Sequence, residues 1–201
     1  MIVADDGSTD ATASIAREHG ARVVTVAARQ IAAARNAGAR ASTGGSLIFI
    51  DADTLVSAAV LRAAVDAMAA GVAGGGAIVH IDGRIPLYLR PATMIFPWLL
   101  SALRLAAGCF IFCTRPAFDA VGGFDETLYA TEEIALSRAL KRHGRFVILR
   151  VPVLTSGRKL RSHSAAEILG LFGVALRSGR GALRTRRHLG LWYGTRRDDP
   201  K

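Results

Sequence analysis

A short apolar run that ends in two aspartates restricts the fold of this chain more than any other feature. Leu47-Ile48-Phe49-Ile50 is followed at once by Asp51-Ala52-Asp53. Such a run is typical of a buried strand, and an alternating backbone points both aspartates to the same side at its carboxyl end. Carboxylates in that place suit Mg²⁺ or Mn²⁺ carrying a diphosphate. The same spacing also arises by chance and at helix caps. The pair alone is therefore compatible with a metal site and with a purely structural role.

Strand-like and helix-like segments alternate along the chain. Strands are expected at 2–4, 22–26, 47–50, 77–81, 109–113 and 146–151, and helices at 10–19, 30–42, 57–70 and 132–143. This alternation predicts a layered α/β fold with a mainly parallel sheet. Residues 85–107 are apolar but broken by prolines and arginines. They fit either helices packed over the sheet or an amphipathic surface at a membrane interface.

The chain has 201 residues, which fits one domain with a real core. Its net charge of +10 is uneven, because residues 158–201 carry +8 and the preceding residues only +2. Anionic lipid, nucleic acid or a diphosphate are the partners that such a tail favours. Cys109 and Cys113 are expected to be buried free thiols, as in a reducing cytoplasm.

Four motifs in a fixed order resemble the family 2 glycosyltransferases of the GT-A fold. They are Asp5-Asp6-Gly7-Ser8, Ala34-Arg35-Asn36, the Asp51/Asp53 pair (a DXD motif), and Gly122-Gly123-Phe124-Asp125-Glu126 with Glu132-Glu133 after it. The resemblance runs from residue 2 to about residue 157. It implies a GT-A, Rossmann-like three-layer α/β/α sandwich over 1–157. The charge and the helix-like spacing of apolar residues predict a basic C-terminal helical extension over 158–201. Family members begin with one further strand and helix, so the chain is expected to be N-terminally truncated.

The resemblance also implies a donor site. Asp6 would bind a uracil-type base, as in a UDP-sugar, and Asp5 would support the turn or the ribose. Arg35 and Asn36 would reach the base or the diphosphate. Asp53 would ligate the metal, and Asp51 would bind the ribose or a metal-bound water. Turn, cap and surface roles are the alternatives for these residues. Arg158 and Lys159 would clamp the diphosphate, or else form an ordinary basic surface.

Glu133 matches the position of the family's catalytic base, where an aspartate is commoner. It would take the proton from an acceptor hydroxyl during an inverting transfer. Glu132 would support it or cap the helix, and both carboxylates also suit a positive helix N-terminus. Asp125 and Glu126 are expected to fix their loop, with acceptor contact as the alternative.

The expected activity is therefore an inverting, metal-dependent sugar transfer from a nucleoside-diphosphate sugar to an acceptor hydroxyl, the acceptor being lipid-linked or otherwise. The alternative is an inactive remnant that binds a membrane or another partner. The basic tail favours a cytoplasmic protein that is peripheral at an anionic membrane surface. Nucleic-acid binding is disfavoured because no interleaved aromatic and basic reader motif is present. A nucleotidylyltransferase is disfavoured because no glycine-rich phosphate loop opens the chain.

Overall fold

The computed structural model describes residues 1–83, 86–87, 90–158 and 161. The strands are β1 (Ile2–Asp5), β2 (Arg22–Thr25), β3 (Ser46–Ile50), β4 (Thr54–Leu55), β5 (Gly74–Ile81), β6 (Phe110–Thr114) and β7 (Phe146–Thr155). The helices are α1 (Thr12–Glu18), α2 (Ile31–Ala41), α3 (Ala58–Ala69), α4 (Arg90–Ala102), α5 (Arg115–Ala120) and α6 (Glu132–His143). Most of the predicted basic extension lies outside the described residues, so its helical character stays a prediction.

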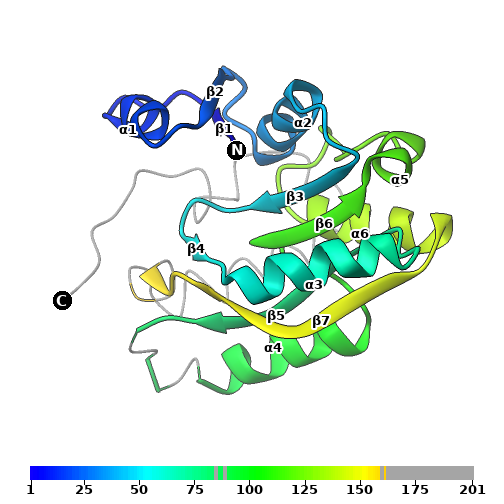
Figure 1. Ribbon diagram of the computed structural model, residues 1–201. Helices are drawn as coiled ribbons and strands as arrows, with labels where there is room; N and C mark the ends of the chain where they lie inside the picture. Colours follow the sequence, from blue (N-terminus) through cyan, green and yellow to red (C-terminus); the bar gives the residue numbers. More distant parts are fainter. Residues whose placement is uncertain (84–85, 88–89, 159–160, 162–201) are drawn as a thin grey trace.

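The strands form two separate sheets (Figure 1). One has five strands in the order β3-β6-β5-β7-β4, and the other is the parallel pair β1-β2. The α/β class is confirmed, but the larger sheet is mixed and not mainly parallel. Among its described strands only β5 and β7 pair in parallel, whereas β6 runs antiparallel to β3 and β5, and β4 runs antiparallel to β7. A helix yields parallel pairing only when it carries the chain back to the starting end of the sheet, and α4 does not do so before β6.

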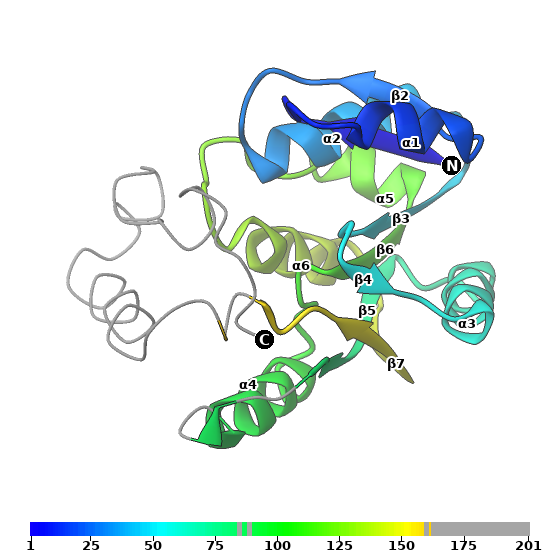
Figure 2. The ribbon, with the colours of Figure 1, turned by 90° about the vertical axis from the view of Figure 1, so that its left-hand side faces the viewer.

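Helices cover both faces of the larger sheet, as Figure 2 shows with the sheet nearly edge-on. Strand β6 divides the core by alternation. Ile111 and Cys113 join the cluster under α2, α5 and α6, and Phe110 and Phe112 join the cluster under α3. The predicted three-layer arrangement follows from this strand, since both of its faces are buried.

Helix α2 contacts both sheets. Gly38 lies against Ala4 of β1, while Ala32 and Ala39 belong to the core beneath α5 and α6. Among the described strands, β1 pairs only with β2 and β3 only with β6. The small sheet is therefore held to the rest of the molecule largely through α2.

Two strands are longer than the sequence pattern indicates. β5 begins at Gly74, because the glycines at 74–76 let neighbouring strands approach; a methyl group on Gly75 would collide with the carbonyl of Val147. β7 continues to Thr155 and pairs with β4, where the Thr54 and Thr155 hydroxyls lie 2.9 Å apart. The extension of β7 brings the end of that strand beside the turn that carries Asp51 and Asp53, since the Ser156 N–H donates to the Asp53 carbonyl.

Candidate active site

The Asp51-Ala52-Asp53 segment forms the turn between β3 and β4, at the carboxyl end of a strand as predicted. The Asp51 N–H donates to the Cys109 carbonyl at 3.1 Å, and the Asp51 carbonyl accepts from the Thr54 N–H at 3.0 Å. The Asp53 carbonyl accepts from the Ser156 N–H at 3.1 Å, just after β7. Backbone bonds to two other segments therefore fix the position of this turn.

Arg35 connects the turn to α6. Its Nη2 donates to Asp51 Oδ1 at 2.8 Å and to the Gly108 carbonyl at 2.7 Å, and its Nη1 donates to Glu132 Oε1 at 2.9 Å. The guanidinium also lies 5.3 Å from the centre of the Phe124 ring. Arg35 was expected to reach the base or the diphosphate; in this structure it is engaged by carboxylates, and the donor contact stays a prediction.

Glu133 completes a cluster of three carboxylates around one guanidinium. A methyl group built on Gly108 would lie 3.6 Å from the Glu133 carboxyl carbon and 3.3 Å from Arg35 Nη2, so these groups are close neighbours. Burial and then the charge of Glu132 raise the pKa of Glu133 to about 7, against a smaller opposing effect of Arg35. Burial lowers the pKa of Arg35, but the charges of Asp51, Glu132 and Glu133 outweigh it. Glu133 thus has the pKa of a proton acceptor at neutral pH.

A strained residue introduces the helix that carries these carboxylates. Thr131, the N-cap of α6, is left-handed with φ 64°, which is rare for a β-branched residue. Glu132 and Glu133 form the first turn of α6, where the helix dipole favours negative charge. Such strain persists only where surrounding contacts impose it, and it is frequent at functional sites.

Asp5 and Asp6 both stabilise the backbone around β1. Asp6 Oδ1 accepts from the N–H groups of Ala28 and Arg29 at 2.9 and 2.7 Å, and its Oδ2 accepts from Gln30 at 2.5 Å. Asp5 Oδ1 accepts from the Ser8 N–H at 3.0 Å. These contacts match the turn role that was the alternative for both residues. A carboxylate has about four acceptor sites, so Asp6 retains one for the predicted base contact.

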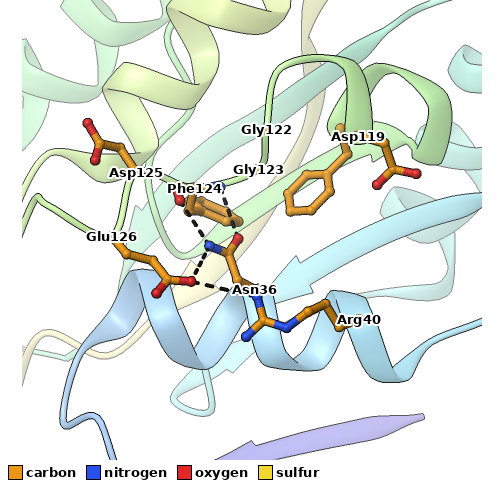
Figure 3. Close-up of a pocket in the computed structure, with 9 residues that line it drawn as sticks. Asn36, Arg40, Asp119, Gly122, Gly123, Phe124, Asp125 and Glu126 are labelled. Carbon is orange, nitrogen blue, oxygen red and sulfur yellow. Dashed lines mark hydrogen bonds and ion pairs between the residues drawn. The ribbon is translucent and has the colours of Figure 1, made fainter.

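Asn36 holds residues 122–126, here called the glycine loop, against α2. Its Nδ2 donates to the Phe124 carbonyl at 2.9 Å and to Glu126 Oε1 at 2.8 Å, and its Oδ1 accepts from the Phe124 N–H at 3.0 Å. Figure 3 shows these bonds beside a pocket of about 570 Å³. The pocket is lined by Asn36, Arg40, Phe118, Asp119 and residues 122–126. The amide is therefore a structural clamp in this structure, and its predicted contact with the donor stays a prediction.

The loop from Asp125 to Leu128 has its own anchors. Asp125 Oδ1 accepts from the Thr127 N–H and hydroxyl at 2.9 and 2.7 Å, which is the loop-fixing role expected for it. Gln30 Nε2 donates to the carbonyls of Glu126 and Leu128 at 2.5 and 3.1 Å. Sequence reasoning missed Gln30, because nothing in its neighbourhood marks a contact nearly a hundred residues away.

The segment after β7 lies next to the end of β5. Asp82 Oδ1 accepts from the Gly157 N–H at 2.7 Å and pairs with Arg161 at 3.5 Å. Arg158 is partly exposed, and its N–H donates to Ser156 Oγ at 3.2 Å. Its backbone therefore lies beside the residue that bonds to Asp53. Lys159 lies outside the described residues, so its predicted role is not placed.

The aspartate turn fits a divalent metal ion whose remaining ligands are oxygens of a bound phosphate or of water. Asp53 is exposed, and within the described residues no hydrogen bond or ion pair engages its carboxylate. Asp51 gives one oxygen to Arg35 and keeps its second. The described part of the chain holds no group of three or more His, Cys, Asp or Glu side chains that could ligate an ion. Such a site suits Mg²⁺ or Mn²⁺ completed by phosphate and water oxygens.

The cysteines take no part in this chemistry. Both are free, Cys113 is buried, and Cys109 is partly exposed next to Gly108. Burial first, and then the charge of Asp51, raises the pKa of Cys109 to about 12, and burial raises that of Cys113 to about 12. Both sulfurs are therefore protonated thiols at neutral pH. The prediction of buried free thiols is confirmed for Cys113, whereas Cys109 is free but only partly buried.

The three-layer α/β fold is that of the GT-A class of proteins, to which the solved structures named below also belong. The model of the family described as "Glycosyl transferase family 2" matches residues 1–121, which is more than half of the chain. The chain belongs to this family. Glu132 and Glu133 lie beyond the matched range and are placed by the structure alone.

Solved structures share the fold at low identity. A mannosyltransferase from Pyrobaculum calidifontis, PcManGT in complex with GDP-Man and Mn²⁺, has a TM-score of 0.60 and 19% identity over 96% of this chain. TarS 1-349 from S. aureus has a TM-score of 0.59 and 17% identity over 87%. Glucosyl-3-phosphoglycerate synthase from Mycobacterium tuberculosis, in complex with Mn²⁺, UDP and glucosyl-3-phosphoglycerate, has a TM-score of 0.59 and 19% identity over 90% of this chain.

This chain is shorter than the proteins it resembles. It covers 59% of the P. calidifontis chain, 55% of the S. aureus chain and 68% of the M. tuberculosis chain. No curated protein matches the sequence. The likeness to these structures therefore establishes the fold, the match to the family model establishes the family, and the reaction is inferred from the site.

Proposed function

We propose that this chain transfers a sugar from a nucleoside-diphosphate sugar to an acceptor hydroxyl, with inversion at the anomeric carbon and with a divalent metal. The observation that carries the proposal is the convergence of Asp51, Arg35 and Glu133 at one end of β3. It places an exposed aspartate turn opposite a carboxylate whose pKa is about 7. Family membership and relatives solved with UDP or GDP-Man and Mn²⁺ support the donor class.

Asp53, with the free oxygen of Asp51, would hold Mg²⁺ or Mn²⁺, which when bound supplies Lewis-acid assistance to the departing diphosphate. Asp6 would accept a hydrogen bond from the base of a UDP-type donor through its remaining acceptor site. Arg35 forms ion pairs with both Asp51 and Glu132, so it would hold the aspartate turn next to the start of α6. Arg158 would approach the phosphates from the segment after β7.

Glu133 would act on the acceptor. As the acceptor oxygen bonds to the anomeric carbon, its proton passes to a Glu133 carboxylate oxygen. The bond from the anomeric carbon to the diphosphate breaks on the opposite face, and the electron pair leaves with the nucleoside diphosphate. Attack from the face opposite the leaving group gives inversion.

Thermal unfolding with nucleoside diphosphates tests the donor site. We expect one nucleotide, UDP foremost, to raise the unfolding midpoint by about 5 °C or more at roughly a hundred times its Kd, and only with Mn²⁺ present. Asp53→Asn should abolish that metal-dependent gain, because it removes the ligand charge. Asp66→Asn, an exposed aspartate on α3, should keep it. A folded wild-type protein that responds to no nucleotide would favour the inactive remnant.

A further inference from the structure

Helix α4 carries an apolar surface that no described element covers. Ile95, Trp98, Leu99 and Leu103 are 59%, 69%, 42% and 51% exposed. We call these four residues the apolar stripe. In Figures 1 and 2, α4 lies at the edge of the molecule, with no described element on its outer side. Large exposed apolar side chains are ordinary when scattered, but a contiguous group of them marks an interaction surface.

Helical spacing makes these residues contiguous. Positions 95, 98, 99 and 103 follow the three- and four-residue steps that place side chains on one face of a helix. The helical bonding continues past Ala102, because the Leu103 N–H donates to the Leu99 carbonyl at 2.9 Å. Leu100, on the other side of the helix, is buried and holds α4 to the body. The helix is thus apolar on both sides, with its outer side facing solvent.

The surroundings of the stripe are basic. The sequence holds no Asp or Glu between Asp82 and Asp119. Arg104 follows the stripe and is exposed. Lys141 of α6 donates to the Leu103 carbonyl at 2.9 Å, and Arg138 and Arg142 beside it are exposed. Exposed apolar residues rimmed by cations complement an anionic bilayer surface, which supplies both an apolar layer and negative head groups.

We propose that the apolar stripe docks into the interface of an anionic lipid bilayer, with Trp98 at head-group depth. The helix would lie on the membrane and not cross it, and none of the helices in the described part is long and apolar enough to cross. An exposed tryptophan on an amphipathic helix is typical of such contact, since its ring is apolar and its N–H is polar.

The stripe is joined closely to the candidate active site. Leu103 precedes Gly108 by five residues, and the Gly108 carbonyl accepts from Arg35 beside Glu133. The Ala106 N–H within this segment donates to Ser137 Oγ of α6 at 3.1 Å. If the proposed sugar transfer holds, docking through the stripe would bring Glu133 toward an acceptor anchored in the membrane. The docking itself does not depend on that transfer.

Binding of the full chain to lipid vesicles tests the proposal without any enzyme assay. Vesicles of phosphatidylcholine alone are compared with vesicles containing about 30% phosphatidylglycerol. We expect the anionic vesicles to bind the protein at least about ten-fold better at low salt. In a Trp192→Phe background, the emission of Trp98 should shift to shorter wavelength on binding, because its ring leaves water.

A triple variant, Ile95→Ser with Trp98→Ser and Leu99→Ser, should lose at least about ten-fold of this binding. The double variant Ile15→Ser with Val65→Ser is the matched control, since those exposed residues lie singly on α1 and α3, and it should bind as the wild type does. All substituted side chains are exposed, so the thermal midpoint should not fall. If the triple variant unfolds, Trp98→Ser alone replaces it.

Three results would overturn the proposal. The triple variant could bind the vesicles as well as the wild type, which would assign binding to another surface such as the basic tail. The wild type could bind neither kind of vesicle. Finally, sedimentation could show a wild-type dimer that the triple variant dissociates, which would make the stripe a contact between two copies of the chain.

Discussion

At the scale of single residues, Arg35 holds the carboxylates of the candidate active site together. It is 11% exposed and lies between Glu132, 5% exposed, and Asp51, 43% exposed. A buried carboxylate without a partner is costly, so the arginine makes a negative cluster tolerable inside the fold. The Arg-Asn dipeptide predicted a functional residue here, but its partners could not be predicted, because Gly108 and Glu132 are remote in sequence.

Replacing Arg35 by Met should therefore destabilise the protein by about 3 to 5 kcal/mol, since Glu132 would stay buried and unpaired. Arg40→Met on the same helix is the matched control. Arg40 pairs with Glu126 at 3.7 Å while 68% exposed, so its loss should cost about 0 to 1 kcal/mol. Urea unfolding monitored by circular dichroism measures both values. An equal loss of unfolding free energy in the two variants would show that the buried ion pairs of Arg35 do not stabilise the fold more than the exposed pair of Arg40 does.

Asp6 shows the limits of reading a residue from a motif. The motif pointed to a nucleotide contact, whereas the structure shows three backbone N–H groups from residues 28–30 bound to its carboxylate. Both roles use the same oxygen atoms, and the pattern Asp-Asp-Gly-Ser is compatible with either. Only the three-dimensional path of the chain reveals that the start of α2 returns to β1.

At the scale of elements, segments with local signals were predicted well. Helix α6 has the expected bounds, because carboxylates begin it and Gly144 follows its basic last turn. Strand β5 was underestimated, because glycines weaken strand signals when read locally. Gly74, Gly75 and Gly76 are strand residues only because Phe112 and β7 pack closely against them, which is a tertiary effect.

The glycine loop before α6 offers a test of the Asn36 clamp. Gly122 and Gly123 both have positive φ, 80° and 76°. A methyl group on Gly123 would lie 2.8 Å from Asn36 Oδ1, whereas one on Gly122 would meet nothing within 4 Å. Gly122→Ala should cost about 1 kcal/mol for the backbone alone. Gly123→Ala should cost about 2 to 3 kcal/mol, because the clamp must also shift.

Urea midpoints of these two variants give the comparison. A loss that is no larger for Gly123→Ala than for Gly122→Ala would mean that the clamp yields freely. The loop would then not depend on Asn36 for its position before α6.

At the scale of the whole molecule, the division into two sheets is the feature that sequence reasoning did not provide. Alternating strands and helices predicted the α/β class correctly. They did not predict that β6 would run antiparallel between β3 and β5, because strand order depends on where each helix returns the chain. The charge distribution was visible in sequence, but the apolar stripe needed the structure, since α4 could equally have been covered.

The site as a whole joins elements from three parts of the chain. Strand β3 ends in the aspartate turn, α2 supplies Arg35, and α6 supplies Glu132 and Glu133. Each motif was visible separately in the sequence. Their convergence explains the raised pKa of Glu133. Burial is the largest cause of that rise, and Glu133 is buried because these elements meet.

The measurement that tests this account most directly is the release of nucleoside diphosphate from the sugar nucleotide that the thermal panel selects, followed against pH. For the wild type we expect kcat/KM to rise about ten-fold per pH unit and to level off above about pH 7, where Glu133 is ionised. Glu133→Gln should lower it by roughly 100- to 10,000-fold and remove the rise, while the exposed control Glu18→Gln should match the wild type. A Glu133→Gln protein that is folded and keeps the wild-type rate and pH profile would contradict the assignment of Glu133 as the base.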